Sequence, residues 1–543
     1  MKTVIVGGGA AGASAAARLR RLDESMEIII LEKTDEISIA NCGLPYYISN
    51  VISERDNILV STPQKFKSWF NIVVRLNSEV INIDVENKFV ELKNLEKITY
   101  DNLVLALGAS PIIPNFEGMD NSKVFTVRTL SDADKIKEYI KTNNSQKAVV
   151  IGGGFIGVEM AENLVELGLK TSLIELSNQI IAPVDFEVAV FAQNEMRKKG
   201  VELILSDGVA KFSDNKIVLN SGNTVGFDIV IMAIGVKPEI ELVKKLGINT
   251  NKGIIVDECM KTSNPYIYAA GDSVEVKDFV NGENALIPLA GPANRQGRII
   301  ADNICGINST YKASQGTAVL KVFDLTVASV GNNEKQLKNR KTQYLKTILF
   351  SKSHAGYYPN SSATMFELLF SPNGNILGAQ AVGYENVEKN IDVISAIMRN
   401  GGTVQDMVDF EHCYAPPYAS AKSPINLLGM NAENILKGFV KPAYIEDFTD
   451  SILIDVRPKL FFEKETIDGA INLPIGEIRS RISEIPTNKK VVLFCNTGYT
   501  SYCASRILIQ NGFKNIYSFM GGIELYKEIK KDKTVKESMK MEV

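Results

Sequence analysis

A strand–turn–helix unit with the spacing GxGxxG occurs twice in this chain, and the repetition limits the possible folds more than any other feature. Each copy has an apolar strand before the turn, a helix after it and an acidic residue at the end of the next strand. The residues concerned are Gly7, Gly9, Gly12 and Glu32 in the first copy and Gly152, Gly154, Gly157 and Glu175 in the second.

The three glycines have different tasks in such a turn. The first makes the turn tight, the second lets the backbone approach a pyrophosphate, and the third lets the helix pack closely on the strand. The helix N-terminus faces the phosphates, and the acid can accept both ribose hydroxyls while repelling a 2′-phosphate. One such turn is weak evidence, but two with matching surroundings predict two Rossmann-like dinucleotide-binding domains.

Three further buried-strand patterns accompany these units. Two of them end in Gly108 and Gly235, where we expect the chain to leave a nucleotide domain. A third ends in Gly271-Asp272, and the aspartate can accept a hydroxyl from a polyol chain. A Gly-Asp turn is common, so it indicates such a binding site only together with the two glycine turns.

Length and composition set the remaining bounds. A chain of 543 residues is too long for one core and suggests about three or four domains. Its 45% hydrophobic and 23% charged residues are ordinary for a globular protein. With a net charge of −3 spread along the sequence, we expect neither nucleic acid nor a membrane surface as partner.

The cysteines and the chain start indicate the compartment. Six irregularly spaced cysteines without CxxC fit neither a disulfide scaffold nor a zinc site, so we expect reduced thiols and no metal. The first apolar stretch is too short for a signal peptide or a membrane span. We therefore expect cytoplasmic residence.

The pattern changes after the second nucleotide unit. From about residue 316 to 432 alternating strands precede a helix at 387–399, and residues 438–444 have the composition of a linker. The last segment of about 100 residues has a buried strand that leads into Cys495, a short loop and a helix. We expect the Lys/Glu-rich tail after Lys530 to be frayed.

Cys42 is the residue with the clearest chemical implication. It lies in Asn41-Cys42-Gly43-Leu44-Pro45-Tyr46, and the next cysteine is Cys259. A flavin enzyme with an internal redox disulfide needs a second thiol within a few residues, but Tyr47 stands where it would lie. Any sulfur that pairs with Cys42 must therefore come from outside the chain.

These residues together resemble the single-cysteine branch of the pyridine nucleotide-disulfide oxidoreductases, most of all the coenzyme A-disulfide reductases, over about residues 1 to 430. The end of the chain resembles a rhodanese module through Asp455-Val456-Arg457, the stretch 468–474 and the Cys495 loop. The resemblance implies an α/β chain with two Rossmann-like domains, an α+β dimerisation domain and an α/β rhodanese domain. The implied ranges are 1–110 with 250–315 for FAD, 111–249 for NAD(H), 316–435 for dimerisation and 440–535 for rhodanese.

The resemblance also assigns the cofactor residues. FAD is expected at Gly7, Gly9, Gly12, Glu32 and Asp272, and the nicotinamide cofactor at Gly152, Gly154, Gly157, Glu175 and Gly235. Glu175 favours NADH, with NADPH as the alternative. Phe155 matches an aromatic gate over the flavin or packs beneath the helix. Glu159 is either a polar contact near the nicotinamide or an ordinary helix residue.

A coenzyme A site is implied around Cys42. Ser14, Arg18 and Arg21 share one helix face. The guanidinium groups of the two arginines can converge on phosphates or simply be solvated. Ser38 and Asn41 flank the thiol, and Asn294 and Lys422 match further ligand-facing positions. The family often has a basic residue near position 70, where this chain has Trp69-Phe70. One phosphate contact of the family therefore has no matching residue here.

Two pairs of tyrosines match those that reach across the family's dimer toward the active-site sulfur. The candidates are Tyr357 or Tyr358 and Tyr414 or Tyr418, and we favour Tyr357 and Tyr414. A phenol there can donate to a leaving thiolate or pack on the flavin.

For the last module, the resemblance implies that backbone N–H groups around Cys495 stabilise a persulfide. Related modules that act on thiosulfate often carry arginines where this chain has Asn496 and Thr500, so we expect weak thiosulfate activity and a role in holding or relaying sulfane sulfur. A docking domain without turnover is the alternative. Cys503 more plausibly packs on the following helix than resolves a disulfide.

The predicted function is an NADH-dependent flavin reductase of coenzyme A disulfide, coenzyme A persulfide or polysulfide, acting as a homodimer. Cys42 would be the nucleophile, with a thiol pKa lowered by the helix that follows and by the flavin. The alternative is an NADH oxidase or peroxidase in which Cys42 cycles through sulfenic acid. Such relatives carry a histidine at the start of the first helix, where this chain has Ala10-Ala11.

Overall fold

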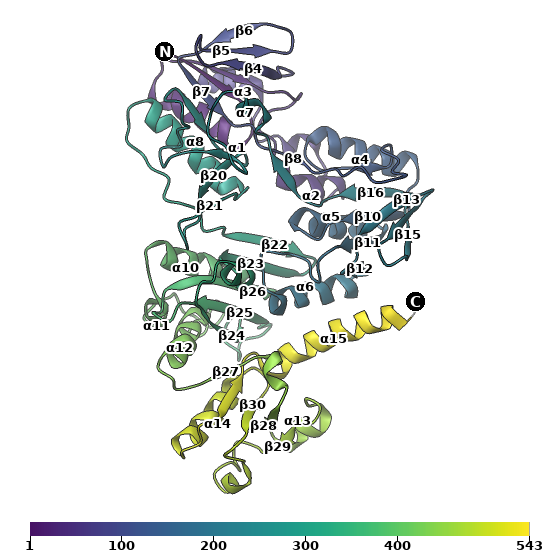
Figure 1. Ribbon diagram of the computed structural model, residues 1–543, viewed down its shortest axis with the longest axis vertical. Helices are drawn as coiled ribbons and strands as arrows, with labels where there is room; N and C mark the ends of the chain where they lie inside the picture. Colours follow the sequence, from purple (N-terminus) through teal and green to yellow (C-terminus); the bar gives the residue numbers. More distant parts are fainter. Residues whose placement is uncertain (542–543) are drawn as a thin grey trace. The chain divides into compact units, whose positions relative to one another are not determined.

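The first fingerprint lies in a five-stranded parallel sheet of order β19-β7-β1-β2-β3 (Figure 1). Most residues of its strands are apolar, and those of β1, β2, β7 and β19 are largely buried in one hydrophobic core. The computed structural model describes residues 1–541. The elements are β1 (Lys2–Val6), α1 (Ala10–Leu22), β2 (Glu27–Leu31), α3 (Pro63–Phe70), β3 (Val73–Arg75), β7 (Asn102–Leu105), β19 (Ile267–Ala269) and α8 (Ala290–Ile304).

Helix α1 packs unusually closely against α8. A side chain at Gly297 of α8 would place its Cβ only 2.3 Å from the carbonyl oxygen of Ala11, so the contact requires glycine. This contact fixes the helix that starts at the first glycine turn. Smaller elements complete the domain: η1 (Asn41–Gly43), α2 (Leu44–Ile48), η2 (Arg55–Ile58), β4 (Val80–Asp84), β5 (Phe89–Leu92), β6 (Lys97–Thr99), β18 (Ile254–Ile255), β20 (Val274–Lys277) and β21 (Asn284–Ala285).

The second fingerprint lies in a sheet of the same kind, of order β12-β11-β10-β16-β9, whose strand pairs are also parallel. The two predicted Rossmann-like folds are therefore confirmed. The elements are β9 (Val124–Phe125), α4 (Leu130–Thr142), β10 (Lys147–Ile151), α5 (Phe155–Glu166), β11 (Lys170–Glu175), β12 (Glu202–Leu205), β13 (Val209–Ser213), β14 (Lys216–Leu219), β15 (Thr224–Gly226) and β16 (Ile229–Met232).

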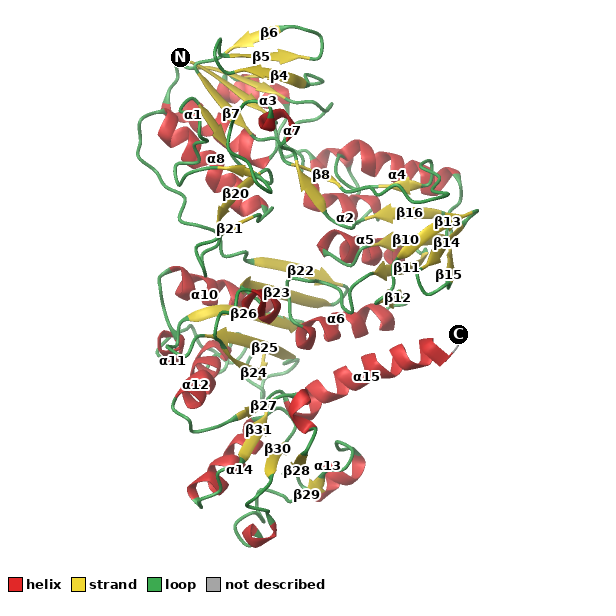
Figure 2. Cartoon of the chain, in the orientation of Figure 1, coloured by secondary structure: helices red, strands yellow, loops and turns green. Residues whose placement is uncertain are grey.

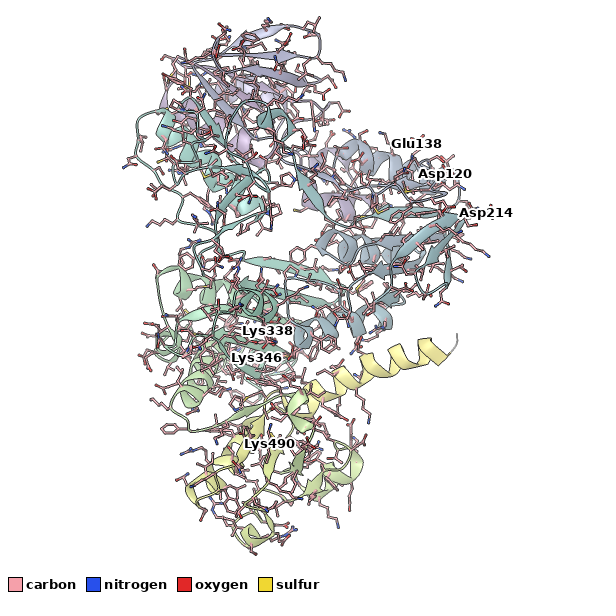
Figure 3. All side chains as sticks on the ribbon, in the orientation of Figure 1. Asp120, Glu138, Asp214, Lys338, Lys346 and Lys490 are labelled. Atoms are coloured by element: carbon pink, nitrogen blue, oxygen red, sulfur yellow. The ribbon has the colours of Figure 1, made fainter. Side chains whose placement is uncertain are left out.

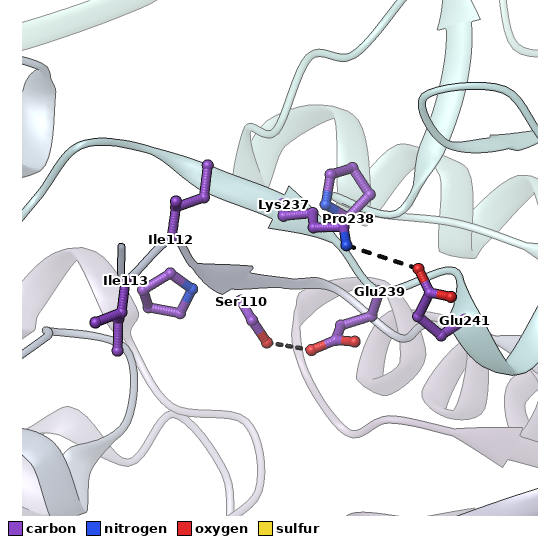
Figure 4. Close-up of a pocket in the computed structure, with 8 residues that line it drawn as sticks. Ser110, Ile112, Ile113, Lys237, Pro238, Glu239 and Glu241 are labelled. Carbon is purple, nitrogen blue, oxygen red and sulfur yellow. Dashed lines mark hydrogen bonds and ion pairs between the residues drawn. The ribbon is translucent and has the colours of Figure 1, made fainter. Parts of the chain in front are cut away.

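An antiparallel ribbon joins the two nucleotide folds. It consists of β8 (Ala109–Pro111) and β17 (Val236–Pro238), with α7 (Glu241–Lys244) after it. Beside the ribbon lies a cavity of about 260 Å³, at which Ser110 donates a hydrogen bond to Glu239 and Lys237 pairs with Glu241 (Figure 4). None of the predicted site residues lines this cavity.

The chain divides into two compact units, and the second comprises residues 179–199 and 317–541 within the described range. It contains a five-stranded antiparallel sheet of order β22-β23-β26-β25-β24 (Figure 2). The elements are α6 (Phe186–Lys198), β22 (Ala318–Val322), β23 (Leu325–Gly331), α9 (Glu334–Asn339), β24 (Leu345–Lys352), β25 (Ala363–Phe370), β26 (Ile376–Gly383), α10 (Val387–Arg399), α11 (Val404–Val408) and α12 (Pro424–Leu436).

The last part of the second unit is a parallel sheet of order β27-β31-β30-β28-β29 with helices around it. This confirms the predicted α/β module. The elements are β27 (Pro442–Ala443), η3 (Ile445–Phe448), β28 (Ser451–Asp455), α13 (Lys459–Lys464), β29 (Ile471–Asn472), η4 (Ile482–Glu484), β30 (Lys490–Phe494), α14 (Tyr499–Gln510), β31 (Ile516–Phe519) and α15 (Gly522–Met541).

Our prediction of a frayed tail after Lys530 does not hold for the first residues of the tail. Helix α15 continues to Met541, and Asp532 is fully buried against α6, where its carboxylate pairs with Arg197 at 2.7 Å. Gln193 donates to the same oxygen of Asp532 at 2.8 Å. The charge of Asp532 therefore serves a contact with α6.

A buried lysine ties the linker of the last module to the antiparallel sheet. Lys346 of β24, labelled in Figure 3, pairs with Glu187 of α6 at 2.8 Å and with Glu334 of α9 at 3.4 Å. Its ammonium lies 4.5 Å from the centre of the Tyr444 ring, and the Tyr444 hydroxyl donates to the Lys346 carbonyl at 2.5 Å. Burial of these charges is compensated by their pairing.

Candidate active site

The first glycine turn shows two kinds of glycine. A Cβ at Gly7 would lie 2.2 Å from the Ala106 carbonyl oxygen, and one at Gly12 would lie 2.0 Å from the Gly7 oxygen. Nothing lies within 4 Å of the Cβ position of Gly9. The backbone therefore leaves open space beside the middle glycine, at the N-terminus of α1, and this is where a pyrophosphate fits.

Glu32 ends β2 beside the same turn. One of its carboxylate oxygens accepts a hydrogen bond from the Gly8 amide at 2.7 Å, and the other accepts from the amide and the hydroxyl of Thr34. These bonds hold an acidic acceptor at the edge of the open space. The position suits the hydroxyls of an adenosine ribose.

The second turn repeats this geometry. A Cβ at Gly152 would lie 2.4 Å from the Ala233 oxygen and one at Gly157 1.9 Å from the Gly152 oxygen, whereas Gly154 again has nothing within 4 Å. Glu175 accepts from the Gly153 amide at 2.7 Å and from the Ser177 amide at 2.7 Å. Both turns thus fit a dinucleotide by the same physical criteria.

Two further cofactor positions, Asp272 and Gly235, lie at strand ends. Asp272 follows the left-handed Gly271, and its carboxylate lies 3.6 Å from a guanidinium nitrogen of Arg128. Gly235 has φ = 122° and accepts a hydrogen bond from the Ile112 amide at 3.0 Å, at the start of the β8–β17 ribbon. Sequence reasoning missed Arg128, which no motif marks.

Cys42 lies in η1, directly before α2, and is exposed, and all six cysteines of the chain are free thiols. We expected its thiol pKa to be lowered. Instead, partial desolvation by surrounding atoms raises the pKa of the Cys42 thiol, and the carboxylates of Glu159 and Asp272 add to this effect against Arg128. Because α2 has only five residues, its dipole is too weak to reverse this balance.

The segment after Cys42 is attached to the second nucleotide domain. Tyr46 of α2 donates a long hydrogen bond of 3.5 Å to Glu159 of α5. Ser49 donates to Asn163 of α5 at 2.6 Å, and Tyr47 donates to Asp134 of α4 at 2.9 Å. The segment that follows Cys42 is therefore held by helices of the second nucleotide fold.

Glu159 is the most perturbed carboxyl group of this region. Burial, with the nearby Glu162 as a smaller cause, raises the pKa of Glu159 to about 7 despite the opposing hydrogen bond from Tyr46. Burial and the carboxylate of Glu159 also raise the pKa of the Tyr46 phenol. Such shifts are common at functional sites. Phe155, at the start of the same helix, is half-buried.

The predicted coenzyme A residues of the first unit are partly brought together. Ser14 donates to the side-chain oxygen of Asn294, which joins two positions far apart in the sequence. Arg18 is paired with the buried Asp302 at 2.8 Å, a partner that the sequence did not indicate. Arg21 is exposed, and Ser38 and Asn41 are half-buried beside the start of α2.

The favoured tyrosines lie in the second unit. The hydroxyls of Tyr357 and Tyr414 are 2.8 Å apart and hydrogen-bonded, and this bond raises the pKa of the Tyr357 phenol. Both side chains are exposed, as are those of Tyr358 and Tyr418. The pairing distinguishes Tyr357 and Tyr414 from the two alternatives. Lys422 is also exposed in this unit.

Cys495 directly follows β30 and is buried at the base of a short loop. The Gly498 amide donates to its sulfur at 3.2 Å, and the Ser501 hydroxyl lies 3.7 Å from the sulfur. Arg457 reaches the loop through a 3.2 Å hydrogen bond to the Asn496 side chain. One backbone N–H therefore contacts the sulfur itself, and the loop is held from outside by Arg457.

Among the side chains that the structure describes, no three of His, Cys, Asp or Glu gather as a metal site requires. Within the same residues, every helix is too short or too polar to cross a lipid bilayer.

Three protein-family models match the chain. The model for pyridine nucleotide-disulphide oxidoreductases matches residues 1–297. The dimerisation domain of the same family matches residues 317–423, and the rhodanese-like domain matches residues 443–529. The first of these models alone spans more than half of the chain.

Two relatives match the part before the last module. A protein named NADH oxidase from Methanocaldococcus jannaschii is 35% identical over 80% of this chain and 99% of its own length. A coenzyme A disulfide reductase from Staphylococcus haemolyticus is 34% identical over 80% of this chain and 100% of its own length.

Two solved structures match nearly the whole chain. The reduced CoADR-RHD of Bacillus anthracis is 44% identical, with a TM-score of 0.95 over 97% of this chain and 98% of that one. An NAD-dependent persulfide reductase from A. fulgidus is 35% identical, with a TM-score of 0.92 over 97% of this chain and 100% of that one.

Proposed function

Because the chain belongs to the pyridine nucleotide-disulphide oxidoreductase family and ends in a rhodanese-like domain, we propose that it is a flavin enzyme that uses NADH to reduce coenzyme A disulfide, coenzyme A persulfide or polysulfide. The observation that carries this proposal is Cys42, an exposed thiol without a neighbouring cysteine that lies among charged groups of both nucleotide domains. A similar coenzyme A disulfide reductase and a similar persulfide reductase support it.

The cofactors are assigned to the two glycine turns. FAD fits the first, with its pyrophosphate beside Gly9 and its ribose on Glu32, and Asp272 is the acceptor for a ribityl hydroxyl. NADH fits the second, beside Gly154 and Glu175. The carboxylate of Glu175 disfavours the 2′-phosphate of NADPH. When bound, the flavin passes two electrons from the nicotinamide to sulfur.

Coenzyme A is assigned to the α1 face beside Cys42. Ser14 and Asn294 already form one polar contact, and the exposed Arg21 can bind phosphate oxygens. Asp302 orients Arg18 on the same helix face. Ser38 and Asn41 flank the thiol, and Lys422 supplies a further positive charge from the dimerisation domain.

The chemistry at Cys42 is thiol–disulfide exchange. Its thiolate attacks one sulfur of coenzyme A disulfide, forms a mixed disulfide and releases coenzyme A thiolate. With coenzyme A persulfide, attack on the outer sulfur moves that sulfur to Cys42 and releases coenzyme A thiolate. Two electrons then cleave the new sulfur–sulfur bond and restore the Cys42 thiolate.

The tyrosine pair is assigned to the leaving thiolate. We infer a homodimer, consistent with the dimerisation-domain match, in which Tyr357 and Tyr414 of one subunit serve the Cys42 site of the other. Their hydroxyls form one hydrogen-bonded unit that can donate a proton to a thiolate.

The rhodanese-like module is assigned to holding or relaying sulfane sulfur on Cys495. The Gly498 amide and the Arg457-supported loop favour a negatively charged sulfur. Replacing Cys495 with Ser tests this role. Slower persulfide reduction at limiting substrate supports a relay, whereas unchanged rates at all substrate levels mean that the module only docks.

The reductase proposal is tested by anaerobic NADH oxidation with each of the three substrates. The Cys42→Ser protein should lose essentially all activity, because no other thiol replaces the nucleophile, while the matched Cys259→Ser protein should keep it. Full rates in the Cys42→Ser protein would refute the proposal. Mass spectrometry of the intact protein should also show a coenzyme A adduct on Cys42 alone.

An NADH oxidase is the second candidate, and the similar protein of that name from Methanocaldococcus jannaschii favours it. In that reaction two electrons reduce oxygen to peroxide, peroxide oxidises Cys42 to sulfenic acid and leaves as water, and two further electrons reduce the sulfenic acid to the thiolate. Aerobic NADH oxidation without a sulfur substrate discriminates the two. A rate above that with coenzyme A disulfide or persulfide would make the oxidase the main function.

A further inference from the structure

The Cys42 thiol belongs to a closed loop of the chain, residues 40–58. The loop is closed at its neck, where the Ala40 amide donates a hydrogen bond to the Ile58 carbonyl at 2.8 Å. Within the loop, η1 with Cys42 runs directly into α2. Because no residue separates these two elements, the place of the thiol depends on what holds α2.

Helix α4 of the second nucleotide fold holds α2 through the buried Tyr47. Asp134 accepts a hydrogen bond from the Tyr47 hydroxyl at 2.9 Å. Lys137 donates to the Tyr47 carbonyl at 2.7 Å and to the Asn50 side chain at 2.6 Å, and its ammonium lies 4.0 Å from the centre of the Tyr47 ring. Because Asp134 and Lys137 share one face of α4, that face binds Tyr47 at both its hydroxyl and its backbone.

Arg55 of η2 orients the Asp134 carboxylate from the other end of the same loop. Its guanidinium donates to the second carboxylate oxygen of Asp134 at 3.0 Å and to Glu36 of the first fold at 2.9 Å. Both oxygens of Asp134 are thus occupied by the loop, one by α2 and one by η2. Since the pair between Arg55 and Asp134 is partly exposed, it contributes more to geometry than to stability.

We propose that Asp134 and Lys137 are positioning residues for the reaction at Cys42, because they hold Tyr47, and with it α2 and the thiol, in a fixed place between the two nucleotide folds. This role rests on the proposed function of Cys42. Tyr47 stands where a flavin enzyme with an internal disulfide needs its second thiol, and this chain uses the position as an anchor. Cleavage of a disulfide on Cys42 needs such fixed geometry, since a displacement of about 1 Å can cost about a hundredfold in rate.

The test is the anaerobic NADH assay with coenzyme A disulfide. Asp134→Leu removes the acceptor of the Tyr47 hydroxyl, and Lys137→Met removes the donor to the Tyr47 carbonyl. Each should lower kcat about tenfold. The value of kcat/KM for NADH should change by less than about twofold, because it reports the encounter with NADH and not the later step at Cys42. The controls, at exposed positions of the same helix, are Lys135→Met and Glu138→Gln, and both should match the wild type.

Tyr47→Phe provides an independent variant, because it removes only the hydroxyl. Combined with Asp134→Leu it should lower kcat no further than Asp134→Leu alone, since both changes remove the same hydrogen bond. A readout without substrate is hydrogen–deuterium exchange of the FAD-containing protein. Residues 41–50 should exchange faster in each variant than in the wild type, while α8 should exchange at the wild-type rate.

Wild-type kcat in Asp134→Leu, Lys137→Met and Tyr47→Phe would overturn this inference, and the inactivity of Cys42→Ser would then still uphold the reductase. An equal loss of kcat/KM for NADH would also overturn it, because the residues would then only stabilise the fold. Full activity in Cys42→Ser would instead refute the proposed function itself. If Asp134→Leu does not fold with FAD, Tyr47→Phe decides, and its wild-type kcat overturns the inference.

Discussion

At the level of single residues, the glycines of each turn fall into two kinds that the spacing alone does not separate. Gly157 faces a carbonyl oxygen 1.9 Å from its Cβ position, whereas Gly154 faces open space. One glycine is required by the protein backbone, and the other by the ligand that must approach it. The first turn shows the same division between Gly12 and Gly9.

This division predicts different defects from the same substitution. Gly157→Ala forces a methyl group against the Gly152 carbonyl and should destabilise the protein by about 1–3 kcal/mol. Gly154→Ala should leave the melting temperature unchanged but weaken NADH binding. Thermal unfolding and NADH titration measure the two effects separately, and equal melting temperatures for both variants would contradict the prediction.

Much of the site at this scale follows from sequence. The glycines, Glu32 and Glu175 have the expected arrangement because short-range spacing determines the turn. Asp302 and Arg128 carry no such signal, since each meets its partner only through the tertiary fold. The raised pKa of the Cys42 thiol carries no such signal either, because it depends on burial and on Glu159 and Asp272, which come from distant parts of the chain.

At the level of elements, α6 is the least expected feature. Its sequence lies between two strands of the second nucleotide sheet, yet the helix packs in the other unit, against α15. Hydrophobic spacing could predict a helix at 186–198 but not its partner. The start of the tail was mispredicted for the same reason. A charged helix is expected to be solvated, and its sequence does not show that Asp532 has a buried partner on α6.

The contact between α6 and α15 depends on a buried ion pair. Arg197→Met removes the 2.7 Å ion pair with the buried carboxylate of Asp532 and should destabilise the second unit by up to about 3–5 kcal/mol. Lys531→Met removes only an exposed pair with Glu528 and should change stability by less than about 0.5 kcal/mol. Urea unfolding followed with limited proteolysis of α15 provides the comparison, and equal effects of the two substitutions would argue against the buried pair.

At the level of the whole molecule, the proposed homodimer makes each site depend on two chains. The Tyr357–Tyr414 pair is exposed in one subunit, as expected if another chain covers it. Composition and motifs predicted this architecture of four parts. The arrangement of its contacts, such as Tyr444 on Lys346, could not be predicted because it depends on side chains more than 90 residues apart.

A hybrid dimer tests this dependence. One subunit carries Cys42→Ser, and the other carries Tyr357→Phe with Tyr414→Phe. If the tyrosines act across the dimer, one site keeps both its cysteine and its tyrosines, so the hybrid should show about half of wild-type activity. If they act within one subunit, no intact site remains, and the activity should fall to about half of the residual level of the tyrosine variant, because the hybrid has only one Cys42. Purification with two affinity tags isolates the hybrid.

The pair Arg197–Asp532 also has a consequence for synthesis. The two residues are 335 positions apart, so Asp532 is translated long after Arg197. While the ribosome is still making the middle of the chain, α6 has no acidic partner for Arg197 on α15. The second unit can therefore complete its packing only after α15 has been translated, so a premature stop just before α15 would leave Cys42 and Cys495 in place but α6 uncovered.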